Sequence, residues 1–192
     1  MFFDPQILKR IPLTLVLIAI SVLVALITQL GAEREMVYPF LISEYMAGLV
    51  EIRQGQVWRL VTPIFLHFGW LHIIFNMLWL YDLGGAVEIR QGRLALLALV
   101  LGTGVTANLG QYWFSGPLFG GMSGVVYGLL GYVWMQGRYN PRAGLVLHQQ
   151  IAVMMLIWFA LGWVGLIPGI ANMAHTVGLL VGLVAGGLYR PR

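Results

Sequence analysis

The chain has 192 residues, of which 59% are hydrophobic and only 9% are charged. Soluble domains carry about a quarter charged residues, and a mean hydropathy of +0.84 also favours lipid as the main solvent of this chain. The chain has no cysteine, which excludes disulfides, thiol catalysis and cysteine-ligated zinc. Its net charge of +4 comes from basic residues at the ends of apolar runs, so it does not predict nucleic-acid binding.

The apolar residues fall into six runs, at about residues 11–30, 66–87, 94–113, 122–135, 145–166 and 171–188. A membrane span needs roughly 20 apolar residues, and only the fourth run is clearly shorter. The first run follows Lys9 and Arg10, but it is too long for a signal peptide and lacks a cleavage site. We therefore predict an all-α, polytopic membrane protein of six transmembrane helices that form one domain over residues 1–192.

The segment between the first two runs, residues 31–63, is too polar to span a bilayer and is expected to lie at the interface. The basic residues predict the orientation, because cytoplasmic loops carry an excess of Lys and Arg. With a cytoplasmic amino terminus, eight of the eleven basic residues fall inside: Lys9, Arg10, Arg90, Arg93, Arg138, Arg142, Arg190 and Arg192. We expect both termini in the cytoplasm.

Three of the predicted spans carry polar residues near their outer ends. The second run holds His72 and Asn76, the fourth begins near Ser123, and the sixth holds Asn172 and His175. Ionisable residues inside a bilayer are costly and are functional candidates by default. Three separate stretches thus bring polar groups to one membrane depth, which indicates a site.

Ser123 lies at a loop-to-helix junction in Gly120-Gly121-Met122-Ser123-Gly124. The small neighbours Gly121 and Gly124 would let a substrate backbone approach the hydroxyl. Free N–H groups at a helix amino terminus would stabilise an alkoxide and an oxyanion. Taken alone, this motif is also common as a packing element.

His175 precedes Gly178 and Gly182 on one helical face, and Ser123 shares a face with Tyr127, beside Gly124. Two glycine-lined faces can pack closely enough to bring an imidazole to a serine, which is the minimal activated nucleophile. The alternative is a core histidine bonded to a backbone carbonyl. His72 and Asn76 are four residues apart on one face and suit a pair of oxyanion donors, or alternatively anchors for the outer loop.

The sequence lacks the residues that aspartyl and zinc intramembrane proteases need. Asp82 is the one acid in mid-span sequence, whereas an aspartyl protease needs two carboxylates. No His-Glu-x-x-His motif is present, so no metal site is predicted. We expect Asp82 to be neutral, or partnered with a hydroxyl or amide, and not catalytic, and we expect His67 to have a structural role.

Several short motifs together resemble the rhomboid family of intramembrane serine proteases, in particular its bacterial members. They are Trp58-Arg59, His72-Ile73-Ile74-Phe75-Asn76, Gly84-Gly85-Ala86-Val87-Glu88, Ser115-Gly116-Pro117, Gly121-Met122-Ser123-Gly124-Val125-Val126-Tyr127, and Ala174-His175 with Gly178. The resemblance covers residues from about Trp58 to the carboxyl terminus. Asp82 departs from it, at a position where an aromatic or neutral residue is expected.

The resemblance implies a Ser123–His175 dyad with no catalytic acid and no cofactor. It also implies an oxyanion hole of His72, Asn76 and the Ser123 N–H, with Tyr127 packed on the His175 ring. Trp158 and Phe159 would form a substrate gate, and Glu88 would brace the cytoplasmic helix ends. The expected substrates are single-span membrane proteins of a bacterial inner membrane.

Two other functions remain open from the residues alone. A non-catalytic polytopic protein that binds transmembrane helices would use the same cavity, although it has no need of both Ser123 and His175. A small transporter would place its polar residues near the midplane and show internal repeats. We see no repeat between the two halves of the sequence, and the polar cluster sits at one face.

Overall fold

The computed structural model describes residues 5–46 and 48–189, and these residues form helices and loops without a β-strand. The α-helices are α1 (Pro5–Leu8), α2 (Pro12–Ile27), α3 (Arg34–Val37), α4 (Val50–Arg53), α5 (Trp70–Trp79), α6 (Gly85–Gln91), α7 (Arg93–Ser115), α8 (Ser123–Tyr139), α9 (Gln149–Trp163) and α10 (Asn172–Leu188). The short 3-10 helices are η1 (Gln29–Gly31), η2 (Tyr38–Phe40), η3 (Val57–Leu60), η4 (Thr62–Phe65) and η6 (Pro141–Ala143). The all-α prediction is confirmed. Arg190 and Arg192, which the orientation argument uses, lie outside the described residues.

Helices occupy each of the six apolar runs, but two begin later than predicted. Residues 66–69 are not helical, because Gly69, with φ of +98°, redirects the backbone just before α5. Residues 145–148 are also non-helical, although Leu145 is buried in the core. A short apolar segment has the same hydropathy pattern whether it is extended or helical, so the pattern alone does not locate the start of the helix.

The second apolar run forms one continuous helical stretch that contains both α-helix and π-helix. Helices α5 and α6 are joined without a break by η5 (Leu80–Gly84), which is a π-helix. A π-helical turn holds more residues than an α-helical turn and is often found at functional sites. Asp82 lies in this segment and interacts electrostatically with His148 at the start of α9. The expectation of a neutral Asp82, or of a hydroxyl or amide partner for it, stays a prediction.

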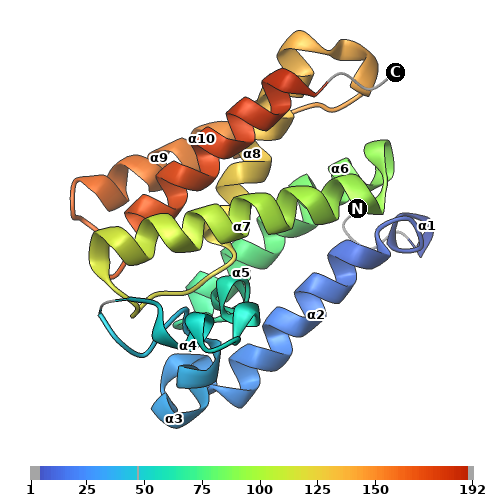
Figure 1. The fold of residues 1–192 in the computed structure, drawn as a ribbon. Coiled ribbons are helices and arrows are strands. Elements are labelled where there is room, and N and C mark those ends of the chain that lie inside the picture. Colours follow the sequence, from blue (N-terminus) through green and yellow to red (C-terminus); the bar gives the residue numbers. More distant parts are fainter. Residues whose placement is uncertain (1–4, 47, 190–192) are drawn as a thin grey trace.

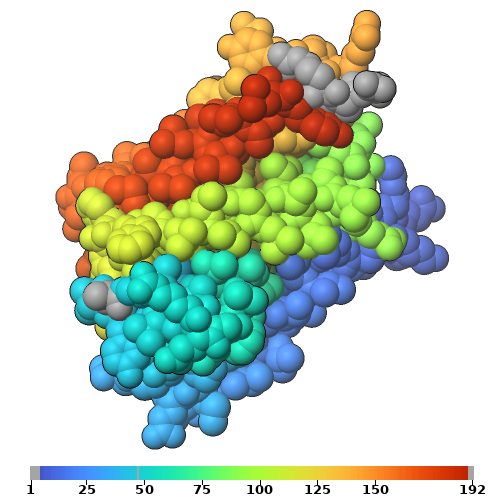
Figure 2. Space-filling model, in the orientation of Figure 1, coloured from blue at the N-terminus to red at the C-terminus, as the bar shows by residue number. Residues whose placement is uncertain are grey.

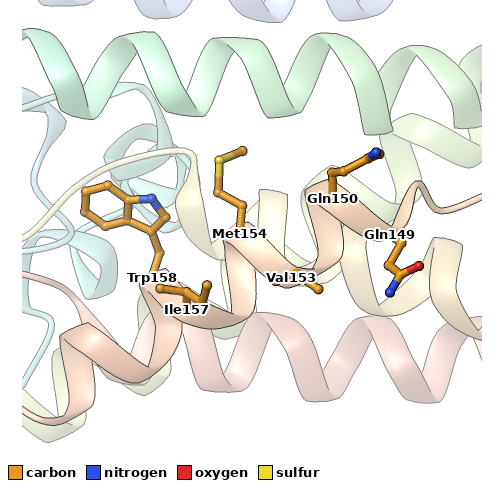
Figure 3. Close-up of a pocket in the computed structure, with 6 residues that line it drawn as sticks. All are labelled: Gln149, Gln150, Val153, Met154, Ile157 and Trp158. Atoms are coloured by element: carbon orange, nitrogen blue, oxygen red, sulfur yellow. The ribbon is translucent and has the colours of Figure 1, made fainter.

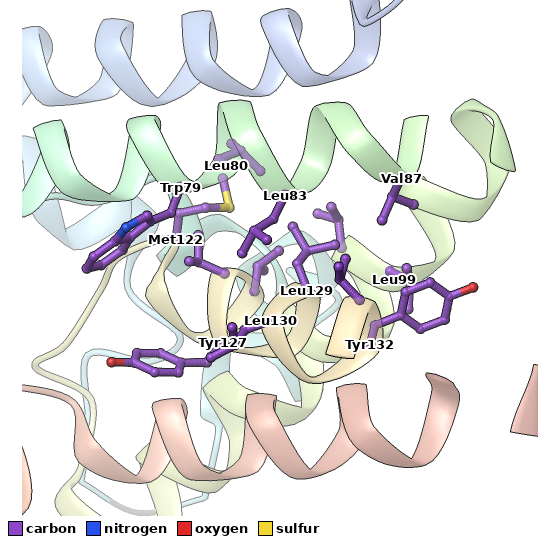
Figure 4. Packing of buried hydrophobic residues seen from close by; sticks show 14 of the residues in the cluster. Trp79, Leu80, Leu83, Val87, Leu99, Met122, Tyr127, Leu129, Leu130 and Tyr132 are labelled. Carbon is purple, nitrogen blue, oxygen red and sulfur yellow. The ribbon is translucent and has the colours of Figure 1, made fainter. Parts of the chain in front are cut away.

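Helix α8 is the central element of the bundle (Figure 1). Every residue from Ser123 to Val133 is buried, and the helix contacts α10, α7 and η5. Trp79, Leu83, Met122, Leu129 and other buried residues form the main core around it (Figure 4). In Figure 2, α7 lies across the visible face, between α10 and the segment that holds α3 and α4.

Helices α8 and α10 approach each other through glycine. A Cβ at Gly178 would overlap the carbonyl oxygen of Gly124, and a Cβ at Gly182 would overlap that of Gly128. Small residues allow backbones to come this close. The contact fixes the relative height of the two helices, and it thereby sets where their first turns meet.

Glu88 of α6 joins the start of α2 to the rest of the bundle. Its carboxylate accepts hydrogen bonds of 2.8 Å from the backbone N–H groups of Leu13 and Thr14 and from the Thr14 hydroxyl. These N–H groups belong to the first turn of α2, where they have no partner within the helix. Arg93 lies 3.8 Å from the same carboxylate.

The segment between α2 and α5 is held by a buried arginine. The Arg59 guanidinium donates to the carbonyl oxygens of Tyr38 and Leu41 at 2.8 and 3.0 Å and pairs with Glu44 at 3.1 Å. Its Nε also donates to Gln56 at 2.7 Å. These bonds make an irregular segment compact enough to cover one end of the bundle.

Large apolar side chains are exposed on the outer helices. They include Leu23 and Leu26 of α2, Leu94 and Trp113 of α7, and Leu188 of α10. Among the described residues, α7 alone is long and apolar enough to cross a membrane by the length criterion, while α2, α9 and α10 are apolar but shorter.

Candidate active site

Ser123 is the first residue of α8, and the loop before it is tightly fixed. The N–H of Gly121 donates to the Pro63 carbonyl at 2.9 Å, and the N–H of Met122 points at His67 Nε2 at 3.4 Å. His67 Nδ1 in turn lies 3.0 Å from the Phe65 carbonyl, which makes Nδ1 the donor and Nε2 the acceptor. His67 therefore holds the loop, in agreement with the structural role expected for it.

His175 meets Ser123 at the first turns of α10 and α8. Its Nε2 lies 2.8 Å from the Ser123 Oγ, and both side chains are buried. The Tyr127 ring packs on the imidazole, with 4.6 Å between ring centroids and 30° between the planes. His175 Nδ1 is buried and has no hydrogen-bond partner among the described residues. The contact is thus a serine–imidazole pair without a third polar member.

His72 presents a fixed N–H to the same place. Its Nδ1 accepts the backbone N–H of Phe68 at 3.2 Å, so the proton of the neutral ring is on Nε2. A Cβ built at Gly121 would lie 2.5 Å from that Nε2 and 3.6 Å from the Ser123 Oγ. Gly121 also has φ of +125°, which favours glycine. Glycine here leaves space between a donor and the serine.

Asn76 lies one turn below His72 on α5 and is buried. Its Nδ2 donates to the His72 carbonyl at 2.9 Å, and its Oδ1 has no hydrogen-bond partner among the described residues. An amide nitrogen carries two hydrogens, so one remains for a further acceptor.

A cavity of about 690 Å³ joins these side chains. It is lined by Ser123, His175, His72, Asn76 and Tyr127, and by Trp158 from α9. Residues 167–171, which connect α9 to α10, also line it. Phe159 packs on the Tyr127 ring at 5.7 Å between centroids. Among the described residues, no group of three or more His, Asp or Glu side chains could hold a metal ion.

A family model described as the Rhomboid domain matches residues 54–192. The chain belongs to the rhomboid family. It is 45% identical over 129 residues to the rhomboid protease GlpG of Salmonella choleraesuis (strain SC-B67), Salmonella newport (strain SL254) and Salmonella typhi. The matched part is 67% of this chain and 47% of each relative, so the match spans about half the length of these rhomboid proteases.

One polar contact at the site of this rhomboid was missed by the sequence analysis. Gln111 of α7 is buried, accepts the backbone N–H of Ala174 at 3.0 Å, and donates to the Ser115 hydroxyl at 3.1 Å. Ala174 is next to His175, so Gln111 holds the first turn of α10. Gln111 could have been found by the same search for polar residues near the outer ends of the predicted spans, because the third apolar run is also predicted to end on the outer side.

Proposed function

We propose that this chain is an intramembrane serine endopeptidase that hydrolyses peptide bonds in or next to transmembrane segments. The observation that carries the proposal is the 2.8 Å contact between Ser123 Oγ and His175 Nε2 in a cavity of a rhomboid-family chain. Ser123 is the nucleophile and His175 the general base. The relatives' printed name, rhomboid protease, supports the same activity.

The mechanism follows from which atoms face the cavity. His175 Nε2 takes the proton of the Ser123 hydroxyl while Oγ forms a bond to the scissile carbonyl carbon. The negative charge that develops on the carbonyl oxygen meets His72 Nε2–H, the second Asn76 N–H and the free Ser123 N–H at the start of α8. The imidazolium gives its proton to the leaving amine as the C–N bond breaks. Water then attacks the acyl-enzyme with His175 again as base.

The packing on His175 compensates for the missing carboxylate. In a triad the carboxylate orients the imidazole. Here Tyr127 fixes the ring by stacking, and Gln111 fixes the backbone beside it. Gly178 and Gly124 hold the two helices at the required separation.

The substrates we propose are single-span membrane proteins that enter beside α9, past Trp158 and Phe159. A helical substrate must unwind locally, because its carbonyls are otherwise engaged in internal hydrogen bonds. Gly, Ala and other helix-weakening residues near the cut should favour cleavage. The exposed apolar side chains of α2, α7 and α10 support a lipid environment.

For the location, we propose one domain with six spans in a bacterial inner membrane and both termini in the cytoplasm. The spans correspond to α2, α5 with η5 and α6, α7, α8, α9 and α10. Lys9, Arg10, Arg90 and Arg142 then lie at the cytoplasmic side, in accord with the positive-inside rule.

The test compares the native chain with Ser123→Ala in detergent, using a single-span substrate that has small residues near its outer end. We expect cleavage by the native chain alone. Cleavage by both would identify a different nucleophile, and cleavage by neither with retained substrate would favour a non-catalytic helix binder. His175→Ala should abolish labelling of Ser123 by a fluorophosphonate, and full labelling would exclude His175 as the base.

A further inference from the structure

We propose that the Tyr127 hydroxyl ties α9 to the ring that supports His175, so that displacement of α9 by a substrate is transmitted to the base. The inference rests on the proposed function and adds a positioning role to one of its residues. The hydroxyl of Tyr127 would have this role in addition to the stacking of the ring on His175.

Tyr127 contacts His175 and α9 with different parts of one rigid side chain. The face of its ring lies on the imidazole, 4.6 Å between centroids. Its hydroxyl donates to the backbone carbonyl of Met155 in α9 at 2.7 Å. Tyr127 and Met155 are both buried, so this bond is shielded from bulk solvent. The hydroxyl oxygen lies on the axis about which the ring turns, so rotation of the ring leaves the bond in place, but the ring cannot be displaced from His175 without moving its hydroxyl relative to α9.

The bond to Met155 is not needed to satisfy the backbone. Met155 lies in the interior of α9, where its carbonyl already accepts the N–H of the residue four positions later. The Tyr127 hydroxyl, in contrast, would be left buried without this acceptor. The bond therefore connects α8 to α9 and does not serve to satisfy an unpaired carbonyl at a helix end.

Further polar interactions of α9 lie near its ends, while the rings of Trp158 and Phe159 pack on Phe75 and Tyr127. At its carboxyl end, Asn172 donates to the Gly162 carbonyl at 3.0 Å, and the Trp163 indole donates to the Thr176 hydroxyl at 3.2 Å. At its start, His148 interacts with Asp82.

Between these ends, a groove of about 460 Å³ follows α9 and is lined by residues of that helix, among them Trp158, whose ring packs on Phe75 of α5. In Figure 3 the side chains of Gln150, Met154 and Trp158 extend from α9 toward the facing helix. The Tyr127–Met155 bond holds the middle of α9 from the opposite side, the side of α8.

A substrate helix that separates α9 from α5 must therefore break the 2.7 Å bond or pull Tyr127 with it. Either event changes the ring that packs on His175. A buried hydrogen bond contributes about 1 kcal/mol net, so its loss should raise the open population of α9 about fivefold.

The experiment uses Tyr127→Phe, which keeps the ring and removes the hydroxyl. Tyr132→Phe is the matched control, because Tyr132 is a buried tyrosine of the same helix whose hydroxyl bonds Gln91. The two tyrosines lie at opposite ends of the core cluster (Figure 4). The chain has no cysteine, so spin labels at Leu78→Cys on α5 and Val153→Cys on α9 report the separation directly.

Two measurements are made on each variant. Spin-label distances measure the opening of α9 and need no activity. The rate at which a small fluorophosphonate labels Ser123 measures how well His175 activates the serine, and it does not depend on entry of a substrate helix past α9. For Tyr127→Phe we expect the open population to rise about fivefold. We expect the labelling rate to fall, because the ring on His175 is no longer held by the bond to α9. Tyr132→Phe should change neither.

The outcomes separate the parts of the inference. Opening without a change in labelling would overturn the coupling to His175, and slower labelling without opening would overturn the tie to α9. No change in either would overturn both. If native Ser123 fails to react with the fluorophosphonate, the proposed function fails, and the distances still decide whether the hydroxyl holds α9.

Discussion

Replacing Gly178 by alanine adds one methyl group where α10 lies directly against the α8 backbone. The new Cβ would overlap the carbonyl oxygen of Gly124, whereas a carbon and a carbonyl oxygen need about 3.3 Å. The neighbour is backbone and cannot rotate away. Helix α10 must therefore retreat from α8 by roughly 1 Å.

The retreat acts on the candidate dyad because His175 lies one turn before Gly178 on the same face. The 2.8 Å contact between His175 Nε2 and Ser123 Oγ would lengthen to about 4 Å, beyond hydrogen-bond range. A misplacement of about 1 Å costs on the order of 100-fold in rate. We therefore expect Gly178→Ala to lower kcat/KM about 100-fold.

The assay measures cleavage of a single-span substrate and fluorophosphonate labelling for Gly178→Ala and for Gly187→Ala. Gly187 is in the same helix, but its Cβ would meet only the flexible end of Met135, at 3.2 Å. Both substitutions favour the helix by about 1 kcal/mol, so helix propensity cannot explain a difference between them. Near-native rates for Gly178→Ala would refute the argument that close packing of α8 and α10 sets the dyad.

Asn76→Ala should slow turnover by about ten- to a thousandfold through loss of an oxyanion donor, and unchanged kinetics would make Asn76 structural. Glu88→Gln should lower the thermal midpoint by roughly 4–8 °C, because charge-assisted bonds to α2 contribute about 2 kcal/mol; an unchanged melting curve would count against this brace. Burial raises the pKa of the Glu51 carboxyl. Hydrogen bonds from the Ser43 hydroxyl and the Glu44 N–H, together with the charge of Arg59, lower this pKa by more than burial raises it, so it lies below the ordinary 4.5. These bonds stabilise residues 43–46 and 48–59 above that pH and are lost as the pH falls through the folded pKa, so amide exchange there should accelerate in acid. Glu51→Gln should abolish this acid dependence, and a dependence that persists would assign it to another group.

The sequence predicted the parts of the structure that depend on pattern. Hydropathy located six apolar runs, and each holds a helix. Period-3.6 spacing placed Gly178 and Gly182 on one face of α10, and the structure packs that face on α8. The rule that polar residues inside predicted spans are functional candidates brought attention to Ser123 and His175, which lie in contact. Their catalytic roles remain predictions.

Other features depend on tertiary contacts that leave no local signal. Nothing near Tyr127 shows that its hydroxyl reaches Met155, which comes from another helix. The tautomer of His72 depends on the Phe68 N–H, in a turn that hydropathy had assigned to a helix. The π-helical segment was also unforeseen, since its composition suits an α-helix equally well.

The π-helical segment affects how the chain tolerates a change in length rather than in composition. It separates Asn76, which faces the cavity, from Glu88, which faces α2. A π-helical turn holds one residue more than an α-helical turn, so deleting one residue of Leu80–Gly84 would give an α-helix and leave Asn76 and Glu88 on nearly the same faces. A one-residue deletion in the α-helical parts on either side would instead rotate everything after it by about 100°, and α2 would lose its carboxylate. A gap of one residue is therefore tolerated within Leu80–Gly84 and not beside it.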